Sequence, residues 1–218
     1  MTPDSTRRWS RADYALPAPE LAPALIGALL VHVVRGARRA GVIVETEAYC
    51  GAIDDCSHAH NNRRTPRTEP MFGAPGLAYV YISHGLHRCM NVVCGHEGDA
   101  AAVLIRALEP AEGLPAMRRA RTRPVRKSPL RDVDLCSGPG KLGEAMGIDV
   151  NRSGDDMTTG PALWIEHHRP RPSVRTPRIG MNPSSAWGER PLRWVDASSP
   201  HASRGRGGIL NPTPPDAR

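Results

Sequence analysis

The sequence predicts an α+β fold in which strands dominate, folded as a single compact domain. Residues 41–49 are rich in β-branched side chains, residues 77–82 alternate as a half-buried strand does, and residues 100–108 form an apolar run of strand length. Segments with helical character are few and short. The chain has 218 residues and no internal repeat, which suits one domain.

The expected elements follow in order along the chain. Residues 19–30 predict a short helix leading into a strand at 29–34, and a turn at 36–41 returns the chain as the strand 41–49. A long polar loop at 54–75 precedes the strands expected at 77–82, 87–93 and 100–108. Helices are expected at 111–120 and 137–146, and short strands near 162–166, 178–180 and 192–195.

Both ends of the chain differ in composition from its middle. Residues 1–16 and 203–218 are rich in Pro, Gly, Arg and Ser, which predicts disordered tails around a domain at 17–202. No apolar run approaches the ~20 residues that cross a bilayer, and the N-terminus lacks the apolar core of a secretion signal. We therefore expect a soluble cytoplasmic protein without membrane contact, with its five cysteines reduced.

The net charge of +7 comes almost entirely from arginine. A basic surface favours polyanions such as DNA or RNA through phosphate contacts and counterion release. A GC-rich genome also raises the arginine content, so charge alone leaves nucleic-acid binding open.

The strand at 41–49 ends in a candidate site. Glu45, Glu47 and Tyr49 share one face, because strand side chains alternate. A buried carboxylate destabilises the fold by several kcal/mol unless it is paired or put to use. Arg106 lies in an apolar strand and needs an acidic partner such as Glu47, which is compatible with a structural ion pair and with a functional one.

Aromatic and imidazole groups gather near this strand in the sequence. Tyr49, Tyr79 and Tyr81 are three of the chain's four tyrosines, and His58 and His84 are close to them in sequence. Tyrosines also commonly fill strands, so a structural role for any one of them stays open.

Two other motifs carry weaker signals. Residues 54–60 contain ligand types that suit zinc, but no paired-cysteine or histidine-helix motif accompanies them, and we predict no metal and no cofactor. Residues 137–141 are glycine-rich but lack the spacing of a nucleotide-binding loop. They either bind a backbone phosphate or simply begin a helix.

Taken together, these segments resemble the alkyladenine (3-methyladenine) DNA glycosylase family, as a bacterial member. The matching pieces occur in order between about residues 20 and 200. They include 43–49, 65–67, 79–82, 85–92, 103–110, 135–142, 178–180 and 191–193. The resemblance implies a curved, mostly antiparallel sheet flanked by helices, with a protruding β-hairpin, similar to the C-terminal domain of formyltransferases.

The activity implied by the resemblance is base-excision repair. The enzyme would flip an alkylated purine such as 3-methyladenine or 7-methylguanine out of double-stranded DNA and hydrolyse its N-glycosidic bond. Ethenoadenine and hypoxanthine are further candidate lesions. The expected protein acts as a monomer, associated with the nucleoid.

The resemblance also implies residue roles. Glu47 would activate the attacking water, and Arg106 would help to hold it. Tyr49, His58 and Tyr81 would enclose the flipped base, Asn91 would clash with a guanine amino group, and His84 would intercalate where vertebrate members carry tyrosine. We expect DNA-backbone contacts from Arg63, Thr65, Arg67, Met71, Leu86 and Lys141.

The chemistry of the residues agrees with these roles. An aromatic cage favours a cationic alkylated purine by ~1–2 kcal/mol through cation–π attraction. The only lysines, Lys127 and Lys141, lie outside the tyrosine-rich segments, which predicts a monofunctional enzyme that forms no Schiff base. Two alternatives remain: a hydrolase that uses Glu45 and Glu47 as a carboxylate pair, and a non-catalytic binder of damaged DNA.

Overall fold

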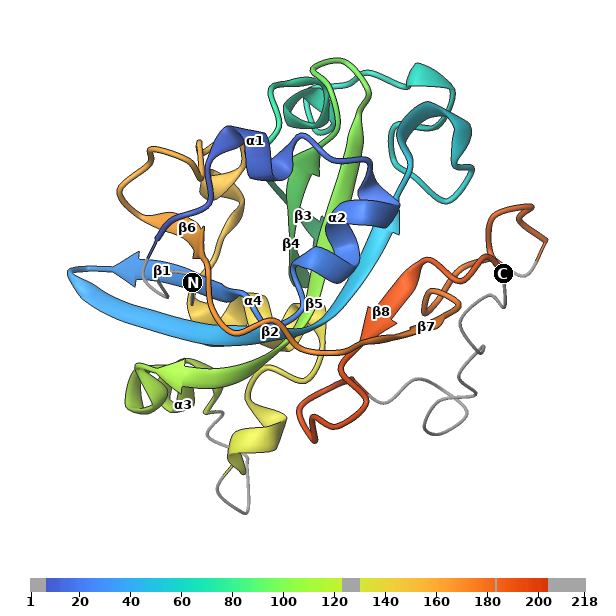
Figure 1. Cartoon of the computed structure of the whole chain (residues 1–218). Coiled ribbons are helices and arrows are strands. Elements are labelled where there is room, and N and C mark those ends of the chain that lie inside the picture. Colours follow the sequence, from blue (N-terminus) through green and yellow to red (C-terminus); the bar gives the residue numbers. More distant parts are fainter. Residues whose placement is uncertain (1–6, 123–129, 183, 204–218) are drawn as a thin grey trace.

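A computed structural model describes residues 7–122, 130–182 and 184–203 of the chain. Within these residues, eight strands form one antiparallel open sheet with few helices around it, as expected for the α+β class (Figure 1). The strands are β1 (Leu29–Val34), β2 (Ala37–Tyr49), β3 (Ala78–Ser83), β4 (His87–Cys94), β5 (Ala101–Glu112), β6 (Leu163–Glu166), β7 (Val174–Thr176) and β8 (Arg193–Val195). The helices are α1 (Arg11–Tyr14), α2 (Ala18–Ala24), α3 (Leu114–Arg121) and α4 (Pro139–Met146).

Strand β2 organises the sheet because it pairs with three other strands. The order along the sheet is β3-β4-β5-β2-β1-β6, and β8 joins β2 and is itself paired with β7. On one edge of β2, residues 37–42 pair with β1 and residues 45–47 pair with β8, while β5 runs along the other edge. The end of β2 that carries Glu47 and Tyr49 is therefore held from both sides.

The pairing of β2 with β5 is irregular at the candidate site. Register shifts occur between Ile43 and Glu45 and between Glu45 and Thr46, so that neither Val44 nor Arg106 has a register partner in this ladder. Such irregularities change the direction of side chains and are frequent beside active sites. Here the irregular segment brings the Arg106 guanidinium onto both Glu45 and Glu47.

Helix α4 explains the glycine-rich residues that precede and begin it. A Cβ atom at Gly143 would lie 2.3 Å from the carbonyl oxygen of Arg88, and one at Gly140 would lie 2.5 Å from Nδ1 of His87. The two glycines therefore allow α4 to pack directly on β4, and Leu142 and Met146 of the same helix are fully buried. Of the two interpretations left open by the sequence, the structure supports the helix start.

The N-terminal boundary of the ordered domain lies earlier than predicted. Residues 7–16 were expected in a disordered tail, but Tyr14 is fully buried, Trp9 is nearly so, and the Trp9 N–H donates to Ile165 O at 2.9 Å. The segment is polar on average, but these two aromatic side chains make apolar contacts that order it. Ser203 is ordered too. Residues 1–6 and 204–218 lie outside the described residues.

Two internal predictions also need correction. Residues 178–180 do not form a strand; the third C-terminal strand is β7 at Val174–Thr176 instead. The Ile179 N–H donates to the Glu47 carboxylate at 2.7 Å, so this backbone group is used by the site and not by a ladder. The loop at 54–75 contains the short 3-10 helices His60–Asn62 and Glu69–Phe72, and another, Gly51–Ile53, comes directly before it.

The β3–β4 hairpin has an exposed tip. The Leu86 N–H donates to Ser83 O at 3.1 Å, and both His84 and Gly85 have positive φ angles, at 49° and 69°. Within the described part of the chain, no helix has both the length and the apolar character needed to span a membrane.

Candidate active site

The carboxylate of Glu47 is fully buried and receives three hydrogen bonds. Tyr49 Oη and Arg106 NH1 both donate to Oε2 at 3.0 Å, and the Ile179 N–H donates to Oε1 at 2.7 Å. Burial, followed by the negative charge of Glu47, raises the pKa of Tyr49 well above its ordinary value, so that its hydroxyl stays a donor. The sequence expectation that Glu47 and Tyr49 share a face is confirmed by their contact.

Glu45 is also fully buried, but its surroundings differ from those of Glu47. Arg106 Nε and Arg193 Nε donate to its Oε1 at 3.0 and 2.7 Å, and the Ser203 hydroxyl and N–H donate to Oε1 and Oε2 at 2.7 Å each. Burial alone lowers the pKa of Arg106, but the charges of Glu47 and Glu45 outweigh it and raise that pKa above its ordinary value. Arg106 thus stays charged between two acids.

A cavity of about 110 Å³ is lined by Tyr49, the hydrogen-bond partner of Glu47. All four residues predicted to bind the base line it, namely Tyr49, His58, Tyr81 and Asn91, together with Cys56, Ser57, Met71, Tyr79, Ala102 and Met181. Tyr49 belongs to the cavity wall and also bonds to Glu47, so it links the two.

The aromatic walls of the cavity contact one another. The rings of Tyr79 and Tyr81 stack at 5.4 Å with an angle of 28° between their planes, and the His58 ring meets Tyr81 edge-on at 4.6 Å. Asn91 is buried and donates from Nδ2 to Tyr79 O at 3.0 Å, which fixes the direction of its amide. These residues therefore lie close together, as the sequence predicts, although they come from β2, β3, β4 and a loop.

Contacts at both ring nitrogens of His58 determine its tautomer. Arg67 NH2 lies 3.1 Å from Nε2, and because a guanidinium can only donate, Nε2 is the acceptor. Nδ1 then carries the proton and donates to Tyr79 Oη at 2.9 Å. Burial, followed by the charges of Arg67 and Arg63, lowers the pKa of His58 to about 4, which agrees with this neutral form.

A buried ion pair lies against the ring of Tyr49. Arg178 donates from NH1 and NH2 to the Asp54 carboxylate at 2.6 and 2.9 Å, and neither side chain is exposed. The Arg178 guanidinium carbon lies 4.7 Å from the centre of the Tyr49 ring. The neighbouring Ile179 supplies the backbone donor to Glu47, so this segment supports both the wall and the carboxylate.

The sequence did not single out this pair. The two residues lie 124 positions apart, and the sequence placed them in separate contexts. Asp54 stood among possible metal ligands, and Arg178 stood in a segment expected as a strand and shared with the family.

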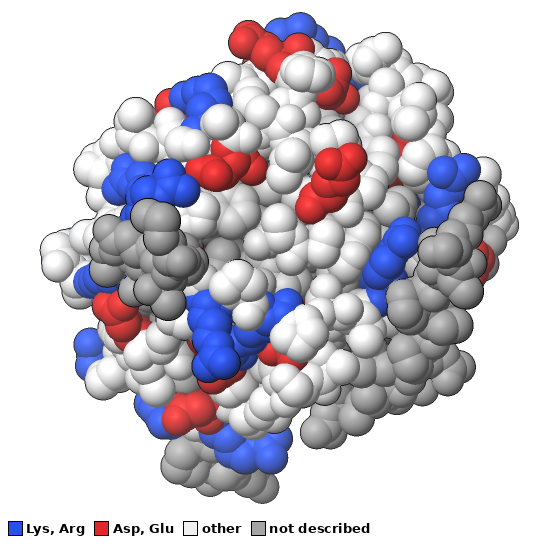
Figure 2. Space-filling model, in the orientation of Figure 1, with Lys and Arg blue, Asp and Glu red and all other residues white. Residues whose placement is uncertain are grey.

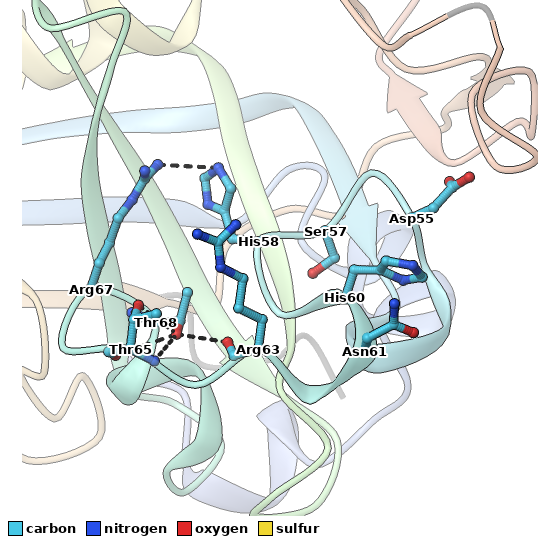
Figure 3. A pocket seen from close by; sticks show the side chains of 9 residues that line it. All are labelled: Asp55, Ser57, His58, His60, Asn61, Arg63, Thr65, Arg67 and Thr68. Atoms are coloured by element: carbon cyan, nitrogen blue, oxygen red, sulfur yellow. Dashed lines mark hydrogen bonds between the residues drawn. The ribbon is translucent and has the colours of Figure 1, made fainter.

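A wider pocket of about 480 Å³ opens next to the cavity and shares Ser57 and His58 with it (Figure 3). Its lining includes three of the predicted DNA-backbone residues, Arg63, Thr65 and Arg67. In Figure 3 the side chains of Arg63 and Arg67 both extend toward His58.

The other predicted DNA-contacting residues lie in different places. Met71 is 2 % exposed and lines the inner cavity, so its side chain does not lie on an outer surface; its apolar character is the physical reason. His84 and Leu86 are exposed at the hairpin tip. Lys141 is exposed on α4, where Nζ donates to Ser137 Oγ at 3.0 Å.

The residue types considered for a metal are engaged in other contacts. Donor atoms of Asp54, Asp55 and Cys56 lie within 4.8 Å of one another. The Asp54 carboxylate already accepts from Arg178, and that of Asp55 accepts from the Ser185 hydroxyl and the Ala186 N–H. Both carboxylates therefore have hydrogen-bonding roles without an ion.

The geometry places a buried carboxylate in contact with an aromatic wall of a cavity, on an antiparallel sheet. The model of the methylpurine-DNA glycosylase family matches residues 12–200, and the chain belongs to this family. It is 41% identical over 196 residues to the human DNA-3-methyladenine glycosylase and 42% identical over 197 residues to the mouse one. Both alignments cover 86% of this chain, but only 65% of the human protein and 58% of the mouse protein.

A bacterial relative matches over nearly its whole length. A protein of Alkaliphilus oremlandii that is provisionally named 3-methyladenine DNA glycosylase is 41% identical over 199 residues. These residues make up 89% of this chain and 98% of that protein.

Proposed function

We propose that this protein is a monofunctional DNA glycosylase that removes alkylated purines from double-stranded DNA. The observation that carries the proposal is the hydrogen bond of 3.0 Å between Tyr49, a wall of the aromatic cavity, and the buried carboxylate of Glu47. A base inside a duplex is unreachable, so the lesion is flipped into the cavity. Glu47 then lies next to the sugar of the flipped nucleotide.

Glu47 serves as the general base of the reaction. A carboxylate has about four acceptor positions, and the described donors use three of them, so Glu47 can accept one further hydrogen bond, from a water. The water attacks C1′ and gives its proton to Glu47, while the glycosidic electron pair leaves with the base. The negative carboxylate also stabilises the oxocarbenium-like transition state. Arg106 positions Glu47.

Cavity residues select the base. The rings of Tyr49, His58 and Tyr81 stack on the faces or edges of a flat purine. Asn91 is buried with its amide held by Tyr79 O, and it disfavours a purine with a 2-amino group. Lesions without that group, such as 3-methyladenine, 1,N6-ethenoadenine and hypoxanthine, are the preferred substrates. The protein acts on DNA as a monomer, in the cytoplasm and close to the nucleoid.

The hydrogen bonds of Glu45 argue against a carboxylate-pair hydrolase. Its four hydrogen bonds come from Arg106, Arg193 and Ser203, none of which lines the cavity. Glu47, in contrast, bonds to Tyr49 of the cavity wall. We assign it a structural role in holding Arg106.

Release of free base tests the proposal. Duplexes carrying 3-methyladenine, 1,N6-ethenoadenine or hypoxanthine are incubated with the protein. Glu47→Gln should bind lesion DNA but release base at least ~100-fold more slowly, the usual size of a general-base contribution. The matched variant Glu45→Gln should mainly lower stability in urea and keep activity in the folded fraction. Absence of release by the unaltered protein from every lesion would end the proposal.

The monofunctional part has its own test. Lys141 bonds to Ser137 on α4 and does not line the cavity, while Lys127 lies outside the described residues. Borohydride added during turnover should trap no covalent protein–DNA adduct, because no amine attacks C1′. A trapped adduct would show a bifunctional enzyme.

A further inference from the structure

Two tyrosine rings of the cavity wall each have an arginine guanidinium over them. Among the described residues, one of these arginines is paired with an acid and the other is not. Arg178 lies 4.7 Å from the centre of the Tyr49 ring and is paired with Asp54. The Arg67 guanidinium carbon lies 5.0 Å from the centre of the Tyr81 ring, and its NH2 donates to His58 at 3.1 Å. Over the stretches 7–122, 130–182 and 184–203, Arg67 forms no ion pair with an acid. Among these residues, no acid therefore pairs with the charge that Arg67 places next to Tyr81 of the cavity wall.

We infer that Arg67 is a specificity-determining residue that shifts the enzyme from cationic lesions toward neutral ones. This inference rests on the proposed glycosylase function. It changes the expectation from the aromatic residues alone, which favoured cationic purines through cation–π attraction.

The first reason concerns binding of the flipped base. A guanidinium already occupies one face of Tyr81, so a cationic purine meets a like charge where the aromatic ring alone would attract it. A neutral purine meets no such repulsion. The donation from Arg67 to His58 also keeps that ring neutral with its proton on Nδ1, so the histidine wall adds no charge of its own.

The second reason concerns bond cleavage. When the glycosidic bond breaks, its electron pair goes to the purine nitrogen. A cationic purine such as 3-methyladenine is neutralised by this pair, whereas a neutral purine becomes negative until solvent protonates it. A fixed positive charge beside the cavity stabilises only the second of these transition states. Arg67 therefore has opposite effects on the two lesion classes.

The experiment compares two adenine lesions without a 2-amino group, so that Asn91 does not distinguish them. Release of 3-methyladenine from methylated duplex DNA and of 1,N6-ethenoadenine from a synthetic duplex is measured with enzyme in excess. In Arg67→Gln, we expect release of ethenoadenine to fall about tenfold and release of 3-methyladenine to stay equal or rise; a unit charge a few ångströms from the base at the protein surface has about this effect. Arg67→Lys, which keeps the charge, should retain most of the ratio between the two rates.

The neighbouring Arg64 provides the matched control. It lies in the same loop and is exposed, but its charge is balanced by Glu69 at 2.8 and 2.6 Å and it lines neither pocket. Arg64→Gln should leave the ratio of the two rates unchanged.

Two outcomes would overturn the inference while leaving the glycosylase proposal intact. Equal slowing of both lesions in Arg67→Gln would show that Arg67 only contacts a phosphate. Unchanged rates for both lesions would show that its charge does not reach the base. Failure of the unaltered protein to release either base would instead refute the proposed function itself.

Discussion

We predict that the buried ion pair of Asp54 and Arg178 contributes strongly to the stability of the fold. Asp54→Asn keeps the size of the side chain and one acceptor for the N–H groups of Cys50 and Cys56, but it removes the charge that faces Arg178. Both side chains are 0% exposed, so the guanidinium would be left buried without a counter-charge. Removal of one partner from a buried pair destabilises a protein by about 3–5 kcal/mol. That is a large share of the ~5–15 kcal/mol that hold a typical domain folded.

Urea unfolding followed by tryptophan fluorescence measures this loss. We expect Asp54→Asn to lower the free energy of unfolding by about 3 kcal/mol. Adding Arg178→Met to it should recover part of the loss, because the unpaired charge is then gone. The exposed pair of Arg64 and Glu69, with side chains 60% and 54% exposed, is the comparison: Arg64→Gln should change the free energy of unfolding by under about 1 kcal/mol.

A strictly additive double-mutant cycle, within about 0.5 kcal/mol, would refute this reasoning. So would a loss of less than about 1 kcal/mol in Asp54→Asn alone, because the pair would then behave like a surface ion pair.

Two further predictions concern histidines. His84→Tyr enlarges the ring at the exposed hairpin tip and should raise affinity for lesion DNA in a titration, because a phenol stacks better than imidazole in the gap left by a flipped nucleotide; weaker or equal binding would contradict an intercalating role. Burial and nearby arginines lower the pKa of His58 to about 4. The stability that its neutral ring contributes is therefore fully present above pH 6.5, the ordinary pKa of histidine, and is lost as the pH falls toward 4. His58→Asn should show a flatter decline in the free energy of unfolding over this window, and a decline as steep as that of the unaltered protein would count against the buried neutral ring.

Local patterns predicted the strands well because each carries its own signal. Residues 41–49 and 77–82 show alternation or β-branching, and both occur as strands in the structure, the first as part of the longer β2. The N-terminal boundary was wrong for a related reason: composition describes an average over a window. In residues 7–16 the average is polar, yet Trp9 and Tyr14 alone supply the contacts that order the segment.

The sequence predicts those site residues that lie near one another along the chain, or that are polar residues within an apolar strand. Glu47, Tyr49 and Arg106 meet this condition, and the structure joins them by hydrogen bonds. The residues that support the site from other parts of the chain fulfil neither condition. Arg178 reaches Asp54 across 124 positions and Ser203 reaches Glu45 across 158, and each is an ordinary polar residue until the fold buries it.

The arginine content shows most clearly how the structure changes the meaning of a sequence property. Three buried arginines face three buried acids: Arg106, Arg178 and Arg193 with Glu45, Glu47 and Asp54. These charges cancel, so they add nothing to a basic surface. On the face shown in Figure 2, basic and acidic side chains are interspersed, without one continuous basic band.

What distinguishes Arg67 is therefore its surroundings and not its residue type. Its charge is exposed, unpaired among the described residues and next to the cavity with aromatic walls. Arg63 stands beside it in the outer pocket. A DNA backbone drawn to these two charges would be placed at the mouth of the cavity, where the flipped nucleotide has to enter, because attraction by unpaired exposed charges is the part of the field that an anion senses. The local balance of charge, more than the net value of +7, is what relates this chain to its proposed substrate.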